Sequence, residues 1–140
     1  MNATIILPDL AIGSYTALAE MKSQGWVCLC LVDEGANTPY DLLVPMIDAG
    51  GNRIEKIKQS IDWILDTWNN KQKVFVCCVH GMNRSVSIGA AALTLAGRTE
   101  WFSNALMFIQ SKRNVATPRD DTMVEILAIV GKRKNLHIEL

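Results

Sequence analysis

A strand, a short loop and a helix follow one another from Val74 to Ala96, and this segment constrains the fold more than any other. Val74-Phe75-Val76-Cys77 is an apolar run with β-branched residues, which is typical of a buried strand. The residues after Arg84 have the composition of a helix, with small and apolar side chains at helical spacing. We therefore predict an α/β domain in which the loop lies at the carboxyl end of a central strand.

The loop contains the residue types that would bind a tetrahedral anion beside a nucleophile. Backbone N–H groups that precede a helix form a nest for oxyanions, and the positive end of the helix strengthens the field. Arg84 offers a planar fork that can hold two phosphate oxygens, and Gly81 permits a turn without a Cβ. The same field favours the ionised form of Cys78, which is then a nucleophile. Ser85 is predicted to donate a hydrogen bond to the sulfur when it leaves.

The alternative to this interpretation is a buried structural cysteine with an unrelated surface arginine. The spacing of Cys78 and Arg84 alone is weak support, because the chain has four cysteines. The glycine, the serine after the arginine, the preceding strand and the following helix make the combined pattern much more specific. The predicted phosphate-binding residues are Val79, His80, Gly81, Met82, Asn83 and Arg84.

Phosphoryl transfer through a cysteine also needs a proton donor for the leaving oxygen. Asp48 is the candidate, because it ends the apolar run 42–47 and lies 30 residues before Cys78. Ala49-Gly50-Gly51 follows it and would allow the loop to move over a substrate. An ordinary loop carboxylate, or a cap for a helix that begins near Asn52, is the alternative role.

The segment from Cys77 to Ser85 resembles the signature His-Cys-x-x-Gly-x-x-Arg-Ser/Thr of the cysteine-dependent phosphatases, and especially of the small (atypical) dual-specificity protein phosphatases. Every fixed position matches except the first, where Cys77 replaces the histidine of the family. Residues 6–14, 25–32, 44–48 and 112–118 are similar to further segments of these enzymes, so the resemblance covers nearly the whole chain.

This resemblance implies a metal-free phosphatase without a cofactor that hydrolyses phosphate monoesters through a phosphocysteine intermediate. Its expected substrates are proteins phosphorylated on tyrosine, and also on serine or threonine. The catalytic residues would be Cys78, Arg84, Asp48 and Ser85. Phosphate, sulfate and vanadate are expected to bind the loop as competing oxyanions.

Two other functions remain open. His80-Gly81-Met82-Asn83-Arg84 is similar to the His-Gly-x-Asn-Arg of the cysteine-dependent RNA 5′-triphosphatases, so an RNA 5′ end or a small molecule is an alternative substrate. A phosphoanhydride needs no acid for its leaving group, so a functional Asp48 favours monoesters. The second alternative is a pseudophosphatase that binds phosphate without turnover, but such a protein would not need Cys78.

The remaining sequence predicts one domain, residues 1–140, with a central, mostly parallel sheet of about four to five strands flanked by helices. The chain has 140 residues, 49% of them hydrophobic, which is enough for one core. Hydrophobic periodicity predicts helices at Ser14–Gln24, Asn52–Asn69, Arg84–Ala96, Thr99–Lys112 and Asp120–Lys132. Strands are predicted at Thr4–Leu7, Val27–Val32, Leu42–Met46 and Val74–Cys77.

Composition excludes several classes of function. The net charge is zero, so the chain lacks the strongly basic character of most nucleic-acid-binding proteins. Neither a leader sequence nor an apolar stretch long enough to cross a membrane is evident, and we expect a cytoplasmic protein. Cys28 and Cys30 lack the spacing of a zinc site and are predicted to be small buried residues of a strand.

Overall fold

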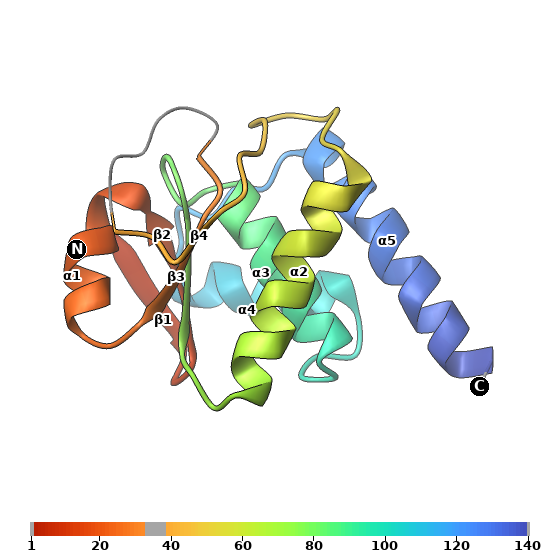
Figure 1. The fold of residues 1–140 in the computed structure, drawn as a ribbon. Helices are drawn as coiled ribbons and strands as arrows, with labels where there is room; N and C mark the ends of the chain where they lie inside the picture. The colour runs from red at the N-terminus through yellow and green to blue at the C-terminus, as the bar shows by residue number, and fades with distance from the viewer. Residues whose placement is uncertain (1, 33–38, 140) are drawn as a thin grey trace.

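Five strands form one sheet in the computed structural model, which describes residues 2–32 and 39–139 (Figure 1). Their order across the sheet is β1-β2-β5-β3-β4. The pair β1 and β2 is antiparallel, and the pairs β2–β5, β5–β3 and β3–β4 are parallel. The structure confirms the predicted α/β class with a mostly parallel sheet. The strands are β1 (Ala3–Leu7), β2 (Leu10–Ser14), β3 (Val27–Cys30), β4 (Leu42–Leu43) and β5 (Val74–Cys78).

Helices cover both faces of this sheet (Figure 1). One face packs against the 3₁₀ turn Tyr15–Ala17 and α1 (Leu18–Ser23), and the other faces the remaining four helices. In α3 all but the last residue is buried, because this helix lies between β5 and the other helices of its layer. The layer consists of α2 (Ile54–Asn69), α3 (Arg84–Leu95), α4 (Phe102–Lys112) and α5 (Asp120–Glu139).

Strand β5 lies at the centre of the sheet, and all five of its residues are buried. An apolar run without polar alternation is what a strand covered by helices on both faces requires. Val76 packs in the larger hydrophobic cluster, on the side of α2 to α5, while Phe75 and Cys77 pack in the smaller cluster beside α1. The loop that follows Cys78 is therefore held between two rigid elements, β5 and α3.

The structure differs from the predicted elements in several places. Leu10–Ser14 forms a strand that was not predicted, since its alanine and glycine have little strand preference and burial between β1 and β5 decides its conformation. The predicted helix from Ser14 is wrong at its start: Ser14 ends β2, and the α-helix begins only at Leu18. β4 has two residues where the sequence predicted five.

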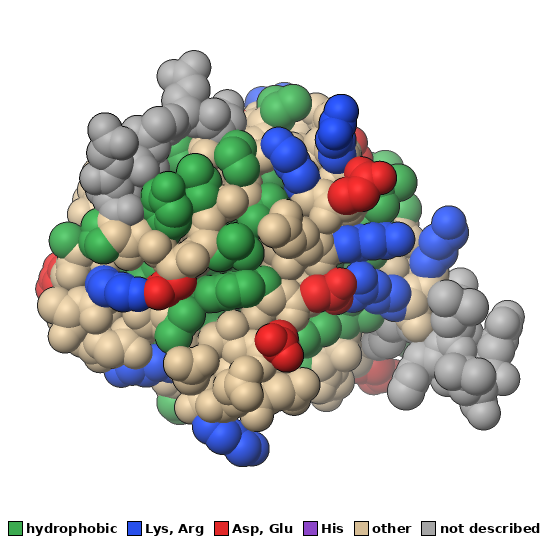
Figure 2. Space-filling model, viewed as in Figure 1, with side chains coloured by type: hydrophobic (Ala, Val, Ile, Leu, Met, Phe, Trp, Pro, Cys, Tyr) green, Lys and Arg blue, Asp and Glu red, His purple; other side chains and the backbone are tan. Residues whose placement is uncertain are grey.

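Charged side chains of both signs lie beside one another on the face seen in Figure 2, in keeping with the zero net charge. One such pair joins Arg133 of α5 to Asp62 of α2, with Nη1 2.7 Å from Oδ1. Within the described residues, no helix combines the length and the apolar composition that a bilayer crossing requires.

Candidate active site

The nucleophile candidate Cys78 is the last residue of β5, and its side chain is buried on the side of the sheet that faces α3. Its Sγ lies 3.2 Å from the Oγ of Ser85 in the first turn of α3. This pair forms because strand, loop and helix reverse the chain over only a few residues. A hydroxyl at this distance can donate a hydrogen bond to an ionised sulfur.

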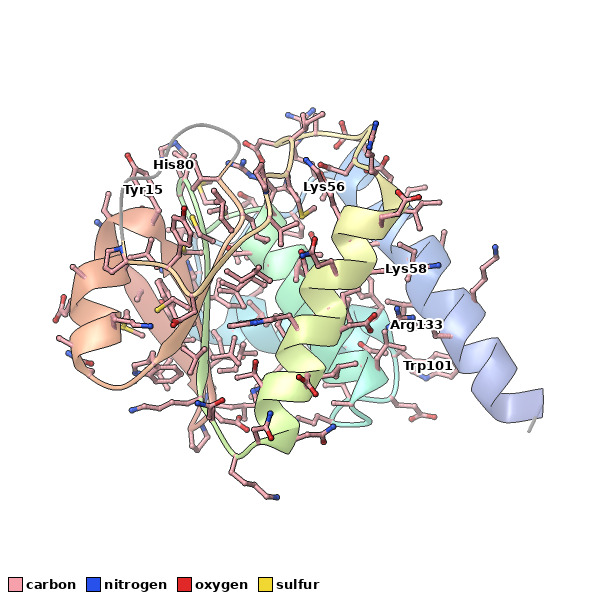
Figure 3. The ribbon with its side chains drawn as sticks, viewed as in Figure 1. Tyr15, Lys56, Lys58, His80, Trp101 and Arg133 are labelled. Atoms are coloured by element: carbon pink, nitrogen blue, oxygen red, sulfur yellow. The ribbon has the colours of Figure 1, made fainter. Side chains whose placement is uncertain are left out.

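Cys78, Arg84 and Asp48 all line one hollow of about 240 Å³ at the carboxyl edge of the sheet. His80 and Met82 also line it, and Figure 3 shows His80 at this edge of the molecule, far from Trp101 and Arg133. The other lining residues are Asn83, Thr117 and Arg119. The three residues that the proposed chemistry needs thus converge from β5, α3 and the segment after β4.

A larger hollow of about 1010 Å³ lies at the opposite edge, near the amino ends of the strands. Asp9, Trp68 and Arg98 are among its lining residues, none of which is a cysteine or histidine. Size alone therefore does not identify the candidate site, which is the smaller hollow with the thiol.

Arg84 is held rigidly although its side chain carries a charge and is only 2% exposed. Its Nη1 donates to two backbone carbonyls, those of Met46 at 2.8 Å and Leu31 at 3.3 Å. Its Nε lies 3.6 Å from the Oδ1 of Asp48. These acceptors follow β4 and β3, so the carboxyl ends of two neighbouring strands orient the guanidinium at the hollow.

Asp48 differs from the other two residues because its side chain is about half exposed, at 54%. Its Oδ1 accepts a hydrogen bond of 2.8 Å from the Nδ2 of Asn83. It does not cap α2, whose N-cap residue is Arg53. The carboxyl group is thus oriented on the rim of the hollow while it stays open to solvent.

The side chain of Asn83 makes its hydrogen bonds to residues at the rim of the hollow. Its Nδ2 donates to Thr122 Oγ1 at 3.0 Å as well as to Asp48, and its Oδ1 accepts from the backbone N–H of Arg119 at 2.7 Å. The predicted role of Asn83 in binding phosphate therefore depends on its backbone N–H, because its side chain is used to join the loop to the start of α5.

Each backbone carbonyl of the loop 79–83 accepts a hydrogen bond from a donor that lies outside these five residues. Ser14 Oγ donates to Val79 at 2.6 Å, and Ser87 N donates to Asn83 at 2.9 Å. Thr117 N donates to Met82 at 2.8 Å. The guanidinium of Arg113 donates to the two carbonyls between them, those of His80 and Gly81. This arrangement restricts every peptide plane of the loop.

Gly81 lies where the loop passes directly over the end of β2. Its φ is +66°, and a Cβ built on it would lie 2.5 Å from the backbone carbon of Gly13. Both the conformation and the contact exclude other residues without rearrangement. The glycine of the motif is therefore needed for close packing of the loop on the sheet.

Cys77, which replaces the histidine of the resembling family, has its side chain on the opposite face from Cys78. It packs in the smaller cluster and pairs in register with Cys30 of β3. The hydrogen bond with Cys30 and burial raise the pKa of the Cys77 thiol. Burial also raises the pKa of Cys28 to about 12. Cys28 and Cys77 are therefore packing residues of the core. The start of the loop is bound by Ser14, whose Oγ donates to the carbonyl of Val79.

Several residues of this site were missed in the sequence. Ser14, Arg113, Thr117 and Thr122 come from segments far from the motif along the chain, and each contacts the loop or Asn83. Ser14, Arg113 and Thr117 lie in segments that are similar to the dual-specificity phosphatases, but that similarity gave none of them a role, and Thr122 belongs to no motif. Among the residues that the structure describes, no three His, Cys, Asp or Glu side chains gather in a way that could hold a metal ion.

Neither a protein-family model nor a curated protein sequence matches this chain. Solved structures do. A mouse putative dual specificity phosphatase, crystallised with zinc tungstate, superposes with a TM-score of 0.83 at 18% identity, over 98% of this chain and 91% of that one. Human DUSP28 gives a TM-score of 0.81 at 16% identity, over 98% and 99% of the two chains.

A third likeness is to the human tyrosine phosphatase-like serine/threonine/tyrosine-interacting protein, with a TM-score of 0.76 at 14% identity and 97% coverage of both chains. At these identities the comparisons bear on architecture. This chain has the fold of the dual-specificity phosphatases.

Proposed function

We propose that this protein is a cysteine-dependent phosphatase that hydrolyses phosphate monoesters. The observation that carries the proposal is the convergence of Cys78, Arg84 and Asp48 on one hollow, at the carboxyl edge of a sheet with the dual-specificity phosphatase fold. A thiol, a rigid guanidinium and a solvent-accessible carboxyl group are the nucleophile, the anion-binding group and the acid that this reaction needs.

In the first step the ionised Sγ of Cys78 attacks phosphorus, a sulfur–phosphorus bond forms and the phosphorus–oxygen bond to the leaving group breaks. Arg84 and the N–H groups of the loop bind the nonbridging oxygens as their charge redistributes. Asp48 transfers its proton to the departing oxygen. Its Oδ1 accepts from Asn83 and lies near Arg84, so we assign the transferred proton to Oδ2.

In the second step water attacks phosphorus and the sulfur–phosphorus bond breaks. Asp48, now a carboxylate, accepts a proton from that water, and inorganic phosphate leaves. The departing sulfur carries the electron pair of the broken bond. Ser85 Oγ, 3.2 Å away, donates a hydrogen bond to it and lowers the cost of its departure.

Phosphotyrosine on proteins is the proposed first substrate, with phosphoserine and phosphothreonine as further candidates. The test is a panel of a phosphotyrosine peptide, a phosphothreonine peptide and a triphosphorylated RNA, assayed for phosphate release without added metal. Release from the peptides supports this assignment. Release from the RNA alone would make the protein an RNA 5′-triphosphatase, and binding of oxyanions without release from any substrate would make it a phosphate-binding module.

The proposed location is the cytoplasm, since the reaction needs the nucleophile as a free thiol and reducing compartments maintain thiols. All four cysteines are free in the structure. Tungstate, which was bound in the crystals of the mouse neighbour, is a suitable stable oxyanion for binding experiments on this chain.

The proposed acid leads to a prediction about leaving groups. We expect Asp48→Asn to lower turnover of an alkyl or peptide phosphate by about 10²- to 10⁴-fold, because the amide cannot supply a proton. An activated aryl phosphate leaves without protonation and should lose less than about tenfold. Steady-state rates on the two substrates measure the difference. The matched control is Asp62→Asn on α2, which removes an exposed carboxylate far from the hollow; equal losses on both substrates in Asp48→Asn would exclude the acid role.

A further inference from the structure

The orientation of two loop peptides depends on one side chain outside the motif. Arg113 follows α4 and is 8% exposed. Its Nε donates to the carbonyl of Gly81 at 2.8 Å, and its Nη2 donates to the carbonyl of His80 at 3.0 Å. Its Nη1 donates to the Oγ1 of Thr4 on β1 at 3.0 Å, which anchors the guanidinium to the sheet. Arg113 thus connects two successive carbonyls of the loop to the edge of the core.

The position of a carbonyl determines the direction of the N–H group in the same peptide. Peptide bonds are planar, and none in the described chain is cis, so the C=O and N–H of one peptide point in opposite directions. The carbonyl of His80 shares its peptide with the N–H of Gly81, and the carbonyl of Gly81 shares its peptide with the N–H of Met82. Because Arg113 binds both carbonyls, both N–H groups point away from it.

We infer that Arg113 is a positioning residue of the anion site: it turns the N–H groups of Gly81 and Met82 toward the bound phosphoryl group. This inference rests on the proposed function and deepens it, because it assigns the orientation of the nest to a residue outside the motif. Within the described chain, neither of these N–H groups donates to a protein acceptor, which leaves both available to an oxyanion.

A lysine could not replace this arginine. The two carbonyls and the Thr4 hydroxyl are bound by three nitrogens of one planar group, whereas an ammonium is a single point of donation on a flexible chain. The fit is close on the side of the loop as well: a Cβ at Gly81 would lie 2.8 Å from Nη2 of Arg113.

The experiment compares wild type, Arg113→Met and Arg113→Lys by ¹H–¹⁵N NMR during titration with inorganic phosphate or tungstate. In the wild type we expect the amide protons of Gly81 and Met82 to shift downfield as the anion binds. In both variants we expect these two shifts to be lost, oxyanion affinity to fall by about tenfold or more, and kcat/KM on an activated aryl phosphate to fall by about 10²-fold, since small displacements of catalytic groups have effects of this size.

The matched control is Arg98→Met. Arg98 makes a bidentate ion pair with Asp9 at the opposite edge of the sheet, so this variant removes an equivalent side chain without touching the loop. It should bind anions and shift Gly81 and Met82 as the wild type does. Dispersion of the remaining amide signals shows which variants are folded.

The possible results separate this inference from the proposed function. Wild-type shifts of Gly81 and Met82 in Arg113→Met, or full recovery of them in Arg113→Lys, would overturn the inference, and so would their absence in a wild type that binds the anion. Those results leave the phosphatase proposal intact if the wild type releases phosphate. A wild type that binds anions with the expected shifts but hydrolyses nothing supports the inference and contradicts the enzyme assignment.

Discussion

Replacing Cys78 with serine is expected to lower phosphate release from an aryl phosphate by at least about 10⁴-fold while tungstate binding persists. A serine hydroxyl is a poor nucleophile near neutral pH, whereas a cysteine reacts through its thiolate. In the proposed mechanism Arg84 and the loop amides bind the anion, and these groups remain in the variant. The measurements are steady-state turnover without added metal and titration calorimetry with tungstate.

The control for this prediction is the neighbouring residue. Cys77→Ser makes the same chemical change one position earlier, where the side chain packs on the opposite face of the sheet with Cys30. We expect it to retain most of the turnover and to reduce stability only. Substantial turnover in Cys78→Ser, or an equal loss in the two folded variants, would contradict the assignment of Cys78 as the nucleophile.

Arg84→Lys should lower both oxyanion affinity and turnover, with a loss of about 10³-fold in kcat/KM. Removing one hydrogen-bond donor to a developing oxyanion already costs about 10²- to 10³-fold, and a lysine lacks the fork that holds two oxygens. In the wild type Nη1 of Arg84 donates to the carbonyls of Leu31 and Met46. The single ammonium of a lysine would have to bind both these carbonyls and the anion. Turnover and tungstate affinity, measured on the same preparation, test both effects.

Arg133→Lys is the matched control for Arg84→Lys. Arg133 pairs with Asp62 on the surface of α2, so the same substitution there keeps the charge and leaves the hollow untouched. A surface ion pair contributes about 1 kcal/mol or less to stability, and we expect wild-type turnover. Turnover within tenfold of the wild type in Arg84→Lys would show that a point charge is enough and that the fork has no role.

Local sequence was most informative where neighbouring residues decide the conformation. The run before Cys78 is apolar on both faces, and only a central strand covered by helices accommodates such a run. The loop then has to enter α3 at Arg84, so the order of strand, nest and helix follows from residues adjacent in the chain. The long helix α2 was predicted equally well, because its apolar residues recur at helical spacing.

Strand β2 could not be predicted from local sequence. Leu10–Ser14 is short, contains a glycine and follows a proline, and nothing local favours an extended conformation over a turn. It becomes a strand because β1 and β5 bond to it on either side and it is fully buried. Pairing energy from residues distant in the chain overrides weak local preference.

The sequence by itself determined the motif: a cysteine as the candidate nucleophile, a glycine turn and an arginine at the junction of a strand and a helix, with Asp48 as a candidate acid. The tertiary structure alone decided how these groups are oriented. Ser14, Arg113 and Thr117 bind the loop carbonyls, and Asn83 binds the carboxylate. The physical reason is that a hydrogen bond needs its donor and acceptor within about 3 Å, and only folding brings residues from the two ends of the chain to that distance.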